Sequence, residues 1–310
     1  MNDKGAADIL LPEKRAGELD ASVCGSRTGQ KPEWLKVRLP TGDAYQHLKQ
    51  VIVDNNLHTV CESAACPNRG ECWSRSTATI MILGNICTRS CGFCNVMTGR
   101  PSELDYEEPQ RVAQAVERMQ LRHAVITSVN RDELEDGGAA IWAETIRQVR
   151  ARCPETRVEV LIPDFCGSWQ ALQLVLEARP DVLNHNIETV PRLYMKVRPQ
   201  GKFTRSLELI RRAKLAGLTT KSGLMVGLGE TDDEVLAVLA SLKAAGCDLV
   251  TIGQYMQPTA RHLPVARFVT PETFERLRRS GMAMGFANVF SGPLVRSSYH
   301  AEEQAQALLP

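Results

Sequence analysis

The stretch ATIMILGNICTRSCGFCN (residues 78–95) begins with an apolar run of strand length, ATIMILG, and continues into a polar, cysteine-rich loop. A short apolar run that ends at glycine is typical of a buried strand in a parallel sheet. The same unit, an apolar run followed by an amphipathic helical pattern, recurs along the chain. Strands are predicted over 78–84, 123–129, 157–163, 181–188, 219–227, 248–254 and 285–292, and helices over 108–120, 138–151, 168–178, 204–216, 232–245 and 271–284.

Alternation of strands and helices favours βαβ units, a parallel sheet and therefore the α/β class. A complete eight-unit barrel takes about 250 residues. Residues 78–292 supply six units and a last strand, so we expect a partial (β/α)6 TIM-like barrel. Outside it lie a variable N-terminal extension over 1–42, a segment over 43–77 that opens with a helix at 43–56, and a C-terminal segment over 293–310.

Composition excludes several classes of protein. The chain has 310 residues, a net charge of +1 and 43% apolar residues, which is ordinary for a soluble globular protein. A nearly neutral charge argues against nucleic-acid binding. No apolar run approaches the roughly 20 residues of a membrane span, and the N-terminus lacks the apolar core of a signal peptide. We therefore expect a cytoplasmic protein with no membrane or nucleic-acid partner.

Six of the ten cysteines fall between residues 61 and 94. Cys87, Cys91 and Cys94 form a C-x3-C-x2-C pattern on the loop after the first predicted strand, where barrel enzymes place their chemistry. Three thiolates can hold three irons of a cubane cluster, which leaves the fourth iron open to a ligand. Structural zinc requires four ligands, and no fourth cysteine or histidine stands nearby at a suitable spacing.

A second triplet, C-x4-C-x5-C, precedes the barrel in the stretch CESAACPNRGECW (61–73). Its members are Cys61, Cys66 and Cys72. Again there are three thiolates and no fourth protein thiol.

The first triplet, with Phe93 directly before its last cysteine, resembles the signature of the radical-SAM superfamily. The resemblance implies that the open iron chelates S-adenosylmethionine (SAM) and that reductive cleavage yields a 5′-deoxyadenosyl radical. The two triplets together with GPLVRSSYH (292–300) resemble the lipoyl synthase family. Further stretches similar to that family are SVNRDELEDGGA (128–139), NHNIETV (184–190), VRPQ (197–200) and GLMVGLGET (223–231), so the likeness covers almost the whole chain from about residue 31.

This family resemblance implies two [4Fe–4S] clusters. Ser298, favoured over Ser297, is expected as the fourth ligand of an auxiliary cluster held by the second triplet. The auxiliary cluster would be dismantled to supply sulfur for C6 and C8 of an octanoyl chain on a carrier lysine. On this interpretation 43–77 is the auxiliary-cluster segment, 78–292 the radical-SAM barrel and 293–310 the segment that closes the auxiliary cluster.

The implied partners are octanoylated lipoyl domains, namely the E2 subunits of 2-oxo-acid dehydrogenases and the H protein of glycine cleavage. An electron donor such as flavodoxin or ferredoxin and an iron–sulfur carrier protein are expected as well. Nothing in the sequence indicates more than a monomer.

Candidate SAM ligands should lie where strands end. Ser128 and Asn130 follow the second predicted strand, and Asn186 and Glu188 end the fourth. Arg198 could pair with the SAM carboxylate, because a guanidinium group matches it in geometry. For each residue a purely structural hydrogen bond is the alternative.

Three other functions remain as alternatives. A methylthiotransferase or biotin-synthase-like enzyme would hold its auxiliary cluster differently from the upstream triplet and RSSY. A non-catalytic electron carrier normally has four cysteines per cluster and needs no barrel. A zinc-ribbon nucleic-acid binder does not fit the neutral charge and the missing fourth ligands.

Overall fold

The computed structural model describes residues 32–35, 43–75, 77–101 and 103–305. The predicted N-terminal extension therefore lies outside the described residues except at 32–35, where Glu33–Leu35 form a 3-10 turn, η1. Among the described helices, none is long and apolar enough to cross a membrane.

Seven parallel strands confirm the predicted sheet. They are β2 (Thr79–Ile82), β5 (His123–Ser128), β6 (Arg157–Leu161), β7 (Val182–Asn184), β8 (Thr219–Val226), β9 (Leu249–Gln254) and β10 (Asn288–Gly292), and neighbours in the sheet follow chain order. A short strand, β1 (His58–Thr59), pairs antiparallel with β2. Among the described strands none joins β10 back to β1, so the barrel is partial, as predicted.

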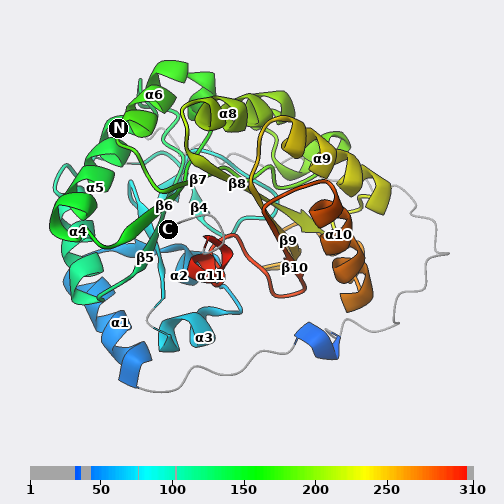
Figure 1. Cartoon of the computed structure of the whole chain (residues 1–310). Coiled ribbons are helices and arrows are strands. Elements are labelled where there is room, and N and C mark those ends of the chain that lie inside the picture. Colours follow the sequence, from blue (N-terminus) through cyan, green and yellow to red (C-terminus); the bar gives the residue numbers. More distant parts are fainter. Residues whose placement is uncertain (1–31, 36–42, 76, 102, 306–310) are drawn as a thin grey trace, which may run out of the picture. The chain divides into compact units, whose positions relative to one another are not determined.

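Helices connect successive strands and cover the outside of the sheet. They are α4 (Glu108–Arg118), α5 (Ala139–Arg152), α6 (Trp169–Glu177), α8 (Phe203–Leu215), α9 (Asp232–Ala244) and α10 (Pro271–Ala283), all within a residue or two of their predicted bounds. Figure 1 shows them as an arc around the strands. Their starts carry the expected caps: Ser168 accepts the N–H of Ala171, and Thr231 forms a capping box with Glu234.

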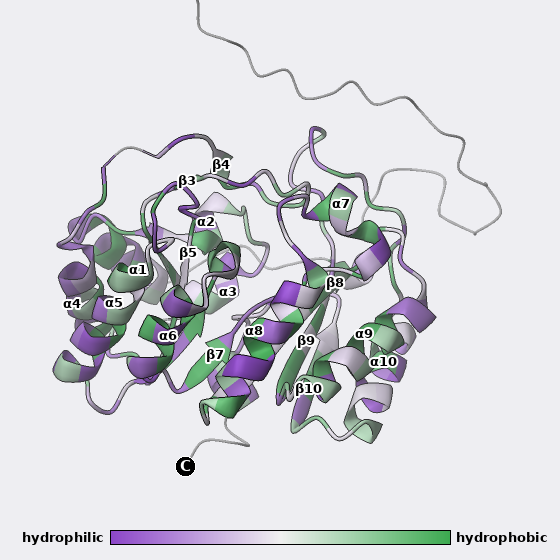
Figure 2. Cartoon of the chain, turned by 90° about the horizontal axis from the view of Figure 1, so that it is seen from above, coloured by the Kyte–Doolittle hydropathy of each residue, from purple (hydrophilic) through white to green (hydrophobic). Residues whose placement is uncertain are grey.

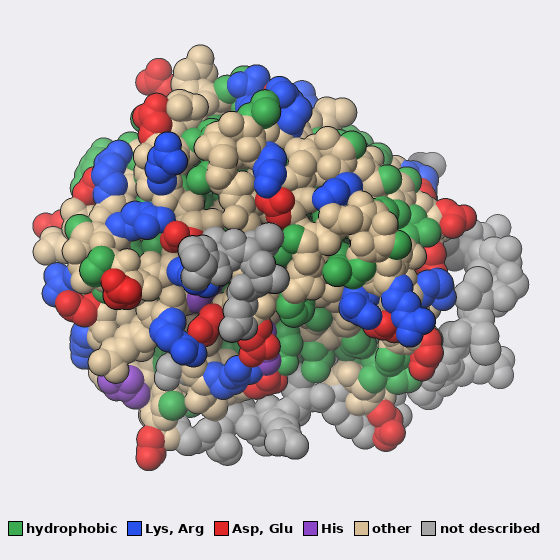
Figure 3. Space-filling view, in the orientation of Figure 1, with side chains coloured by type: hydrophobic (Ala, Val, Ile, Leu, Met, Phe, Trp, Pro, Cys, Tyr) green, Lys and Arg blue, Asp and Glu red, His purple; other side chains and the backbone are tan. Residues whose placement is uncertain are grey.

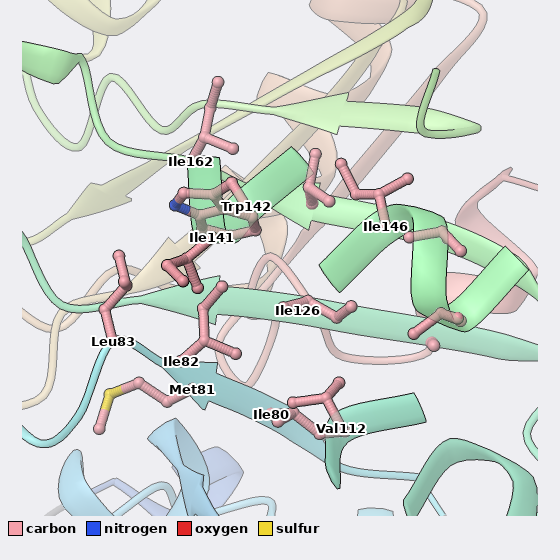
Figure 4. Close-up of a cluster of buried hydrophobic side chains, with 14 of the residues drawn as sticks. Ile80, Met81, Ile82, Leu83, Val112, Ile126, Ile141, Trp142, Ile146 and Ile162 are labelled. Atoms are coloured by element: carbon pink, nitrogen blue, oxygen red, sulfur yellow. The ribbon is translucent and has the colours of Figure 1, made fainter. Parts of the chain in front are cut away.

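The buried face of each helix packs on the sheet, and Figure 2 shows the change from hydrophobic to hydrophilic across the helices. In the first half of the barrel, Ile80 and Ile126 from the strands meet Trp142 and Ile146 from α5, all fully buried (Figure 4). A second apolar cluster lies under β8–β10, α9 and α10. Burial of such side chains contributes about 1.5–3 kcal/mol each.

The predicted strand at 181–188 is too long, because β7 ends at Asn184. Beyond it the chain still follows β8: the N–H of His185 donates to Lys221 and that of Glu188 to Gly223, each at 3.0 Å. Glu188 has a left-handed backbone (φ 68°), which a regular strand cannot accommodate. The irregular backbone therefore carries Asn186 and Glu188 at the carboxyl edge of the sheet.

Further helices and strands lie outside the strand–helix repeat. They are α1 (Asp43–Asp54), α2 (Val60–Ser63), α3 (Arg69–Ser74), β3 (Ile86–Cys87), β4 (Met97–Thr98), η2 (Phe165–Gly167), η3 (Pro191–Leu193), α7 (Tyr194–Val197) and α11 (Ala301–Ala305). In Figure 1, α2 and α11 lie on the inner side of the helical arc.

Candidate functional site

The loop that carries the first cysteine triplet, residues 83–97 (the cluster loop), begins directly after β2. A left-handed turn at Leu83 and Gly84 ends the strand. The carboxylate of Glu108, at the start of α4, accepts the N–H of Leu83 at 2.7 Å and so holds this turn. The chain then reaches Cys87 in β3, as expected for a loop at the carboxyl end of a barrel strand.

The far side of the cluster loop is held by backbone hydrogen bonds. Gly92 donates to the carbonyl of Val197 at 2.9 Å and accepts from the N–H of Leu263 at 3.0 Å. A side chain at this position would collide with Leu263, because a Cβ would lie 2.9 Å from it. His262 adds a bond of 2.9 Å to the carbonyl of Cys94. The glycine between Cys91 and Cys94 therefore allows the loop to approach α7 closely.

The sulfur atom of Cys87 already accepts hydrogen bonds from the protein. The backbone N–H groups of Arg89 and Asn130 lie 3.4 and 3.3 Å from Sγ, and the side-chain amide of Asn130 lies 3.7 Å from it. N–H groups that point at a cysteine sulfur stabilise its thiolate form, and in iron–sulfur proteins they adjust the reduction potential. The protein thus supplies N–H donors to the sulfur of Cys87.

Burial, together with the neighbouring cysteines, raises the pKa of Cys91 to about 12 and that of Cys94 to about 11. Without metal these thiols are protonated at neutral pH, so metal binding must displace their protons.

Among the described residues, no group of three or more His, Cys, Asp or Glu side chains is placed to hold one metal ion. Ligands of mononuclear zinc surround one ion at about 2.3 Å. In a cubane each thiolate binds a different iron, so the sulfur atoms lie farther apart. A cluster that takes one iron at each thiolate is therefore a different kind of site from the one-ion site sought among these residues.

Side chains with unused hydrogen-bonding capacity lie beside the cluster loop. Ser128 Oγ and Asn130 Oδ1 are buried and have no hydrogen-bond partner among the described residues. Asn130 therefore directs its amide at Cys87 and leaves its oxygen free. Buried polar atoms are normally satisfied, so two orphans at a strand end indicate a site for a polar ligand. The predicted SAM site fits this arrangement.

Glu188 and Arg198 lie close to the same loop. Burial raises the pKa of Glu188, and the nearby Arg198 charge opposes this shift. Arg198 is buried, donates to the carbonyl of Asn186 at 2.8 Å, and lowers the pKa of Cys91 through its charge. Phe93 has a different place: it packs against the apolar cluster under β8–β10. All the predicted SAM-site residues except Phe93 thus present polar groups near the carboxyl edge.

One group near the site was missed by sequence reasoning. Arg89, inside the C-x3-C spacing, is 3% exposed and donates to both oxygens of Asp132 at 2.6 and 2.9 Å. It also contacts the buried Asp164 at 2.6 Å, and Asp164 pairs in turn with Arg205 at 2.9 Å. This network ties the cluster loop to the ends of β5 and β6. The sequence contains two signals for this network: the charged Arg89 between two candidate ligands, and Asp164 shortly after a strand.

The second triplet lines a separate pocket. We call it the cysteine pocket; its walls include Cys61, Cys66, Cys72, Arg296 and Ser298. Burial raises the pKa of Cys72 to about 12. Three soft thiols and one hydroxyl in one cavity form a donor set that suits an iron–sulfur cluster.

The two serines of RSSY are placed differently. Ser298 lines the cysteine pocket. The hydroxyl of Ser297 instead lies 2.9 Å from Oδ1 of Asn186, at the carboxyl edge of the barrel. This geometry favours Ser298 over Ser297 as the ligand candidate.

Two family models match the chain. Residues 81–242 match the radical-SAM superfamily, and residues 13–66 match the N-terminal domain of lipoyl synthase of the radical-SAM family.

Curated relatives are similar over most of the chain. A lipoyl synthase from Rubrobacter xylanophilus is 60% identical over 89% of this chain and 87% of its own length. One from Chlorobaculum parvum is 58% identical over 89% and 96%. The mitochondrial lipoyl synthase of Nematostella vectensis is 53% identical over 88% and 94%.

Solved structures support the fold alone. HydG, a maturase of the [FeFe]-hydrogenase, matches with a TM-score of 0.53 and 16% identity over 65% of this chain and 48% of its own. Methylornithine synthase matches with a TM-score of 0.50 and 16% identity over 66% and 68%. Both structures are similar to this chain in their fold.

Proposed function

Since the chain belongs to the lipoyl synthase family of the radical-SAM superfamily, we propose that it inserts sulfur at C6 and C8 of an octanoyl chain on a carrier lysine, with sulfur drawn from an auxiliary [4Fe–4S] cluster. The enzyme is thus a sulfur-inserting transferase whose family uses a [4Fe–4S] cluster and SAM. The observation that carries the proposal is the cysteine pocket, where three cysteines and Ser298 meet although 226 residues separate Cys72 from Ser298.

When bound, the first cluster with SAM supplies a 5′-deoxyadenosyl radical, and the auxiliary cluster supplies sulfur. Cys87, Cys91 and Cys94 would hold the first cluster and leave one iron for SAM. The N–H groups around Cys87 would donate to its sulfur, and the free oxygen of Asn130 would receive a donor group of SAM. Arg198 would face the SAM carboxylate.

Glu188 and Asn186 would complete the SAM site. Glu188 lies near both Arg198 and the cluster cysteines, so its carboxyl group can orient the amino group or ribose of SAM. Asn186 touches Ser297 of the C-terminal segment, which joins the two candidate sites. Ser128, with an unpartnered hydroxyl, is the remaining polar contact.

Cys61, Cys66 and Cys72 would hold the auxiliary cluster, with Ser298 on its fourth iron. An oxygen ligand is harder than thiolate and suits this iron less well, so this corner should open most readily. The chain would thus keep three corners fixed and leave one exchangeable. Accordingly residues 43–77 would form the auxiliary-cluster segment, 78–292 the catalytic barrel and 293–310 its closing segment.

The proposed substrates are octanoylated lipoyl domains: E2 subunits of 2-oxo-acid dehydrogenases and the glycine-cleavage H protein. Flavodoxin or ferredoxin would supply electrons, and an iron–sulfur carrier would restore the auxiliary cluster. We propose a cytoplasmic monomer.

An anaerobic assay with octanoyl-lysyl peptide, SAM and dithionite tests the function. Mass spectrometry should detect a peptide with two added sulfur atoms together with 5′-deoxyadenosine. Cys61→Ala should stop sulfur addition but leave 5′-deoxyadenosine formation. If the peptide stays unmodified while 5′-deoxyadenosine appears, the substrate assignment fails. If a chain loaded with both clusters gives neither product, the catalytic assignment fails.

A further inference from the structure

Ser298 lies between two tethers that hold the C-terminal segment to different parts of the chain. On its N-terminal side, Ser297 contacts Asn186 at 2.9 Å. The contact is close to the backbone of β8, since a Cβ at Gly223 would lie 2.8 Å from Asn186 Oδ1 and 3.0 Å from Ser297 Oγ. This tether joins the segment to the barrel.

The second tether joins the segment to the residue that precedes Cys72. The phenol of Tyr299 donates to the two carboxylate oxygens of Glu71, at 3.0 and 3.2 Å. Nε2 of His300 lies 3.1 Å from the same carboxylate.

Two further side chains extend the second tether. Arg75, which follows α3 as its C-cap, lies 2.9 Å from Nε2 of His300 and 2.9 Å from Glu303 of α11. Glu303 also lies 3.0 Å from Nδ1 of His300. In Figure 3, basic, acidic and histidine side chains are interspersed around the centre of the face of the molecule that is shown. The contacts span about 228 residues of sequence, from Arg75 to Glu303.

The backbone at His300 is constrained. Its φ is 54°, in the left-handed region that non-glycine residues seldom adopt. Such a conformation persists when its surroundings hold it in place. Here the imidazole is held by Glu71 and Glu303, and its ring lies 4.1 Å from that of Tyr299.

We propose that Glu71 is a positioning residue for Ser298: by holding Tyr299 and His300, its carboxylate keeps the Ser298 hydroxyl in the cysteine pocket. The inference rests on the proposed role of Ser298 as a ligand of the auxiliary cluster. Glu71 is itself about half exposed, and exposed charged pairs contribute little to global stability. The effect of Glu71 is therefore local, on the occupancy of one corner of the pocket.

The test uses the full chain with Cys87, Cys91 and Cys94 replaced by alanine, so that only the cysteine pocket can hold iron. After reconstitution with ⁵⁷Fe, Mössbauer spectra report the oxygen-ligated iron. Glu71→Ala should retain a cluster on three cysteines but lose most of this component. Glu71→Gln, which keeps an acceptor oxygen for Tyr299, should restore most of it, and Tyr299→Phe should resemble Glu71→Ala.

Hydrogen exchange supplies a second readout. In the reconstituted chain, amides of 296–300 should exchange about tenfold faster in Glu71→Ala, as expected for loss of a charged hydrogen bond. Glu302→Ala is the matched control: Glu302 lies on α11 beside Glu303 and pairs with Arg122 at 3.1 Å, away from Glu71. It should leave both the Mössbauer component and the exchange rates as in the parent chain.

Two results would overturn the proposal. One is an unchanged oxygen-ligated component and unchanged exchange in both Glu71→Ala and Tyr299→Phe. The other is an equal loss in Glu302→Ala, which would indicate general loosening of α11. Failure of the proposed function is distinguishable, because then the parent chain itself would lack the oxygen-ligated iron, or the unmutated enzyme would fail in the octanoyl-peptide assay.

Discussion

Replacing Arg89 by methionine removes the charge that joins the cluster loop to two neighbouring strand ends. The arginine side chain is 1% exposed and Asp164 is fully buried, while Asp132 keeps 26% exposure. Methionine fills similar space without a charge. The substitution therefore leaves Asp164 with Arg205 as its single ion-pair partner among the described residues.

Breaking a buried ion pair by removing one partner typically costs about 3–5 kcal/mol. Because Asp164 retains Arg205 and Asp132 can reach water, we expect the lower end, about 3 kcal/mol. The loss should also be felt at the cluster loop, where Arg89 stands two residues after Cys87. Iron bound by the first triplet should therefore fall along with the free energy of unfolding.

Urea unfolding of the cluster-free chain measures the stability, and iron analysis after anaerobic reconstitution measures the loop. Arg152→Met is the control, since Arg152 pairs with Glu117 at 2.7 Å but both side chains are more than 40% exposed. Its cost should stay within about 1 kcal/mol. If Arg89→Met unfolds within 1 kcal/mol of the parent chain, as expected of an exposed pair, the structural role given to this network is wrong.

Three further predictions follow from the same geometry. Burial alone would raise the pKa of Asp164, but its two arginine partners outweigh burial and hold the pKa below the usual 3.8. The stability that the charged carboxylate contributes is therefore present above pH 3.8 and lost as the pH falls further. The loss of unfolding free energy in Asp164→Asn, measured in urea, should shrink under acid conditions. Gly223→Ala would bring a methyl group to 2.5 Å from the hydroxyl of Thr251. The free energy of unfolding should therefore fall by about 1–3 kcal/mol, and SAM binding measured by calorimetry should weaken. Ser298→Ala should lower sulfur insertion more than about tenfold, with 5′-deoxyadenosine still formed. Ser297→Ala should retain the iron of the auxiliary cluster. If the two variants change the iron content equally, the choice of Ser298 as the ligand is wrong.

Local patterns predicted the barrel well because strand and helix periodicities are local properties. All seven strands and the six covering helices appear where the apolar runs and amphipathic segments stand. The strand predicted over 181–188 was too long by the widest margin, and its end contains Glu188 in a left-handed conformation that no periodicity encodes. The cysteine triplets were visible because ligand spacing along a loop is also local.

Contacts between distant segments could not be predicted in the same way. The link from Arg89 to Asp164 spans 75 residues, and the link from Glu71 to Tyr299 spans 228. Each side chain alone has the appearance of an ordinary polar loop residue. Only the sheet order, which brings strand ends together, and the return of the C-terminal segment show that these groups meet.

The separation of the parts of the cysteine pocket has a consequence for biosynthesis. Its thiols belong to residues 61–72 and its hydroxyl to residue 298, with the whole barrel between them. Domains fold from the N-terminus as they are synthesised, and contacts between distant residues form slowly. A nascent chain can thus present three thiols well before the serine exists. Iron that binds early would find a pocket that still lacks its hydroxyl ligand. Maturation of the pocket must therefore wait for translation to pass residue 298.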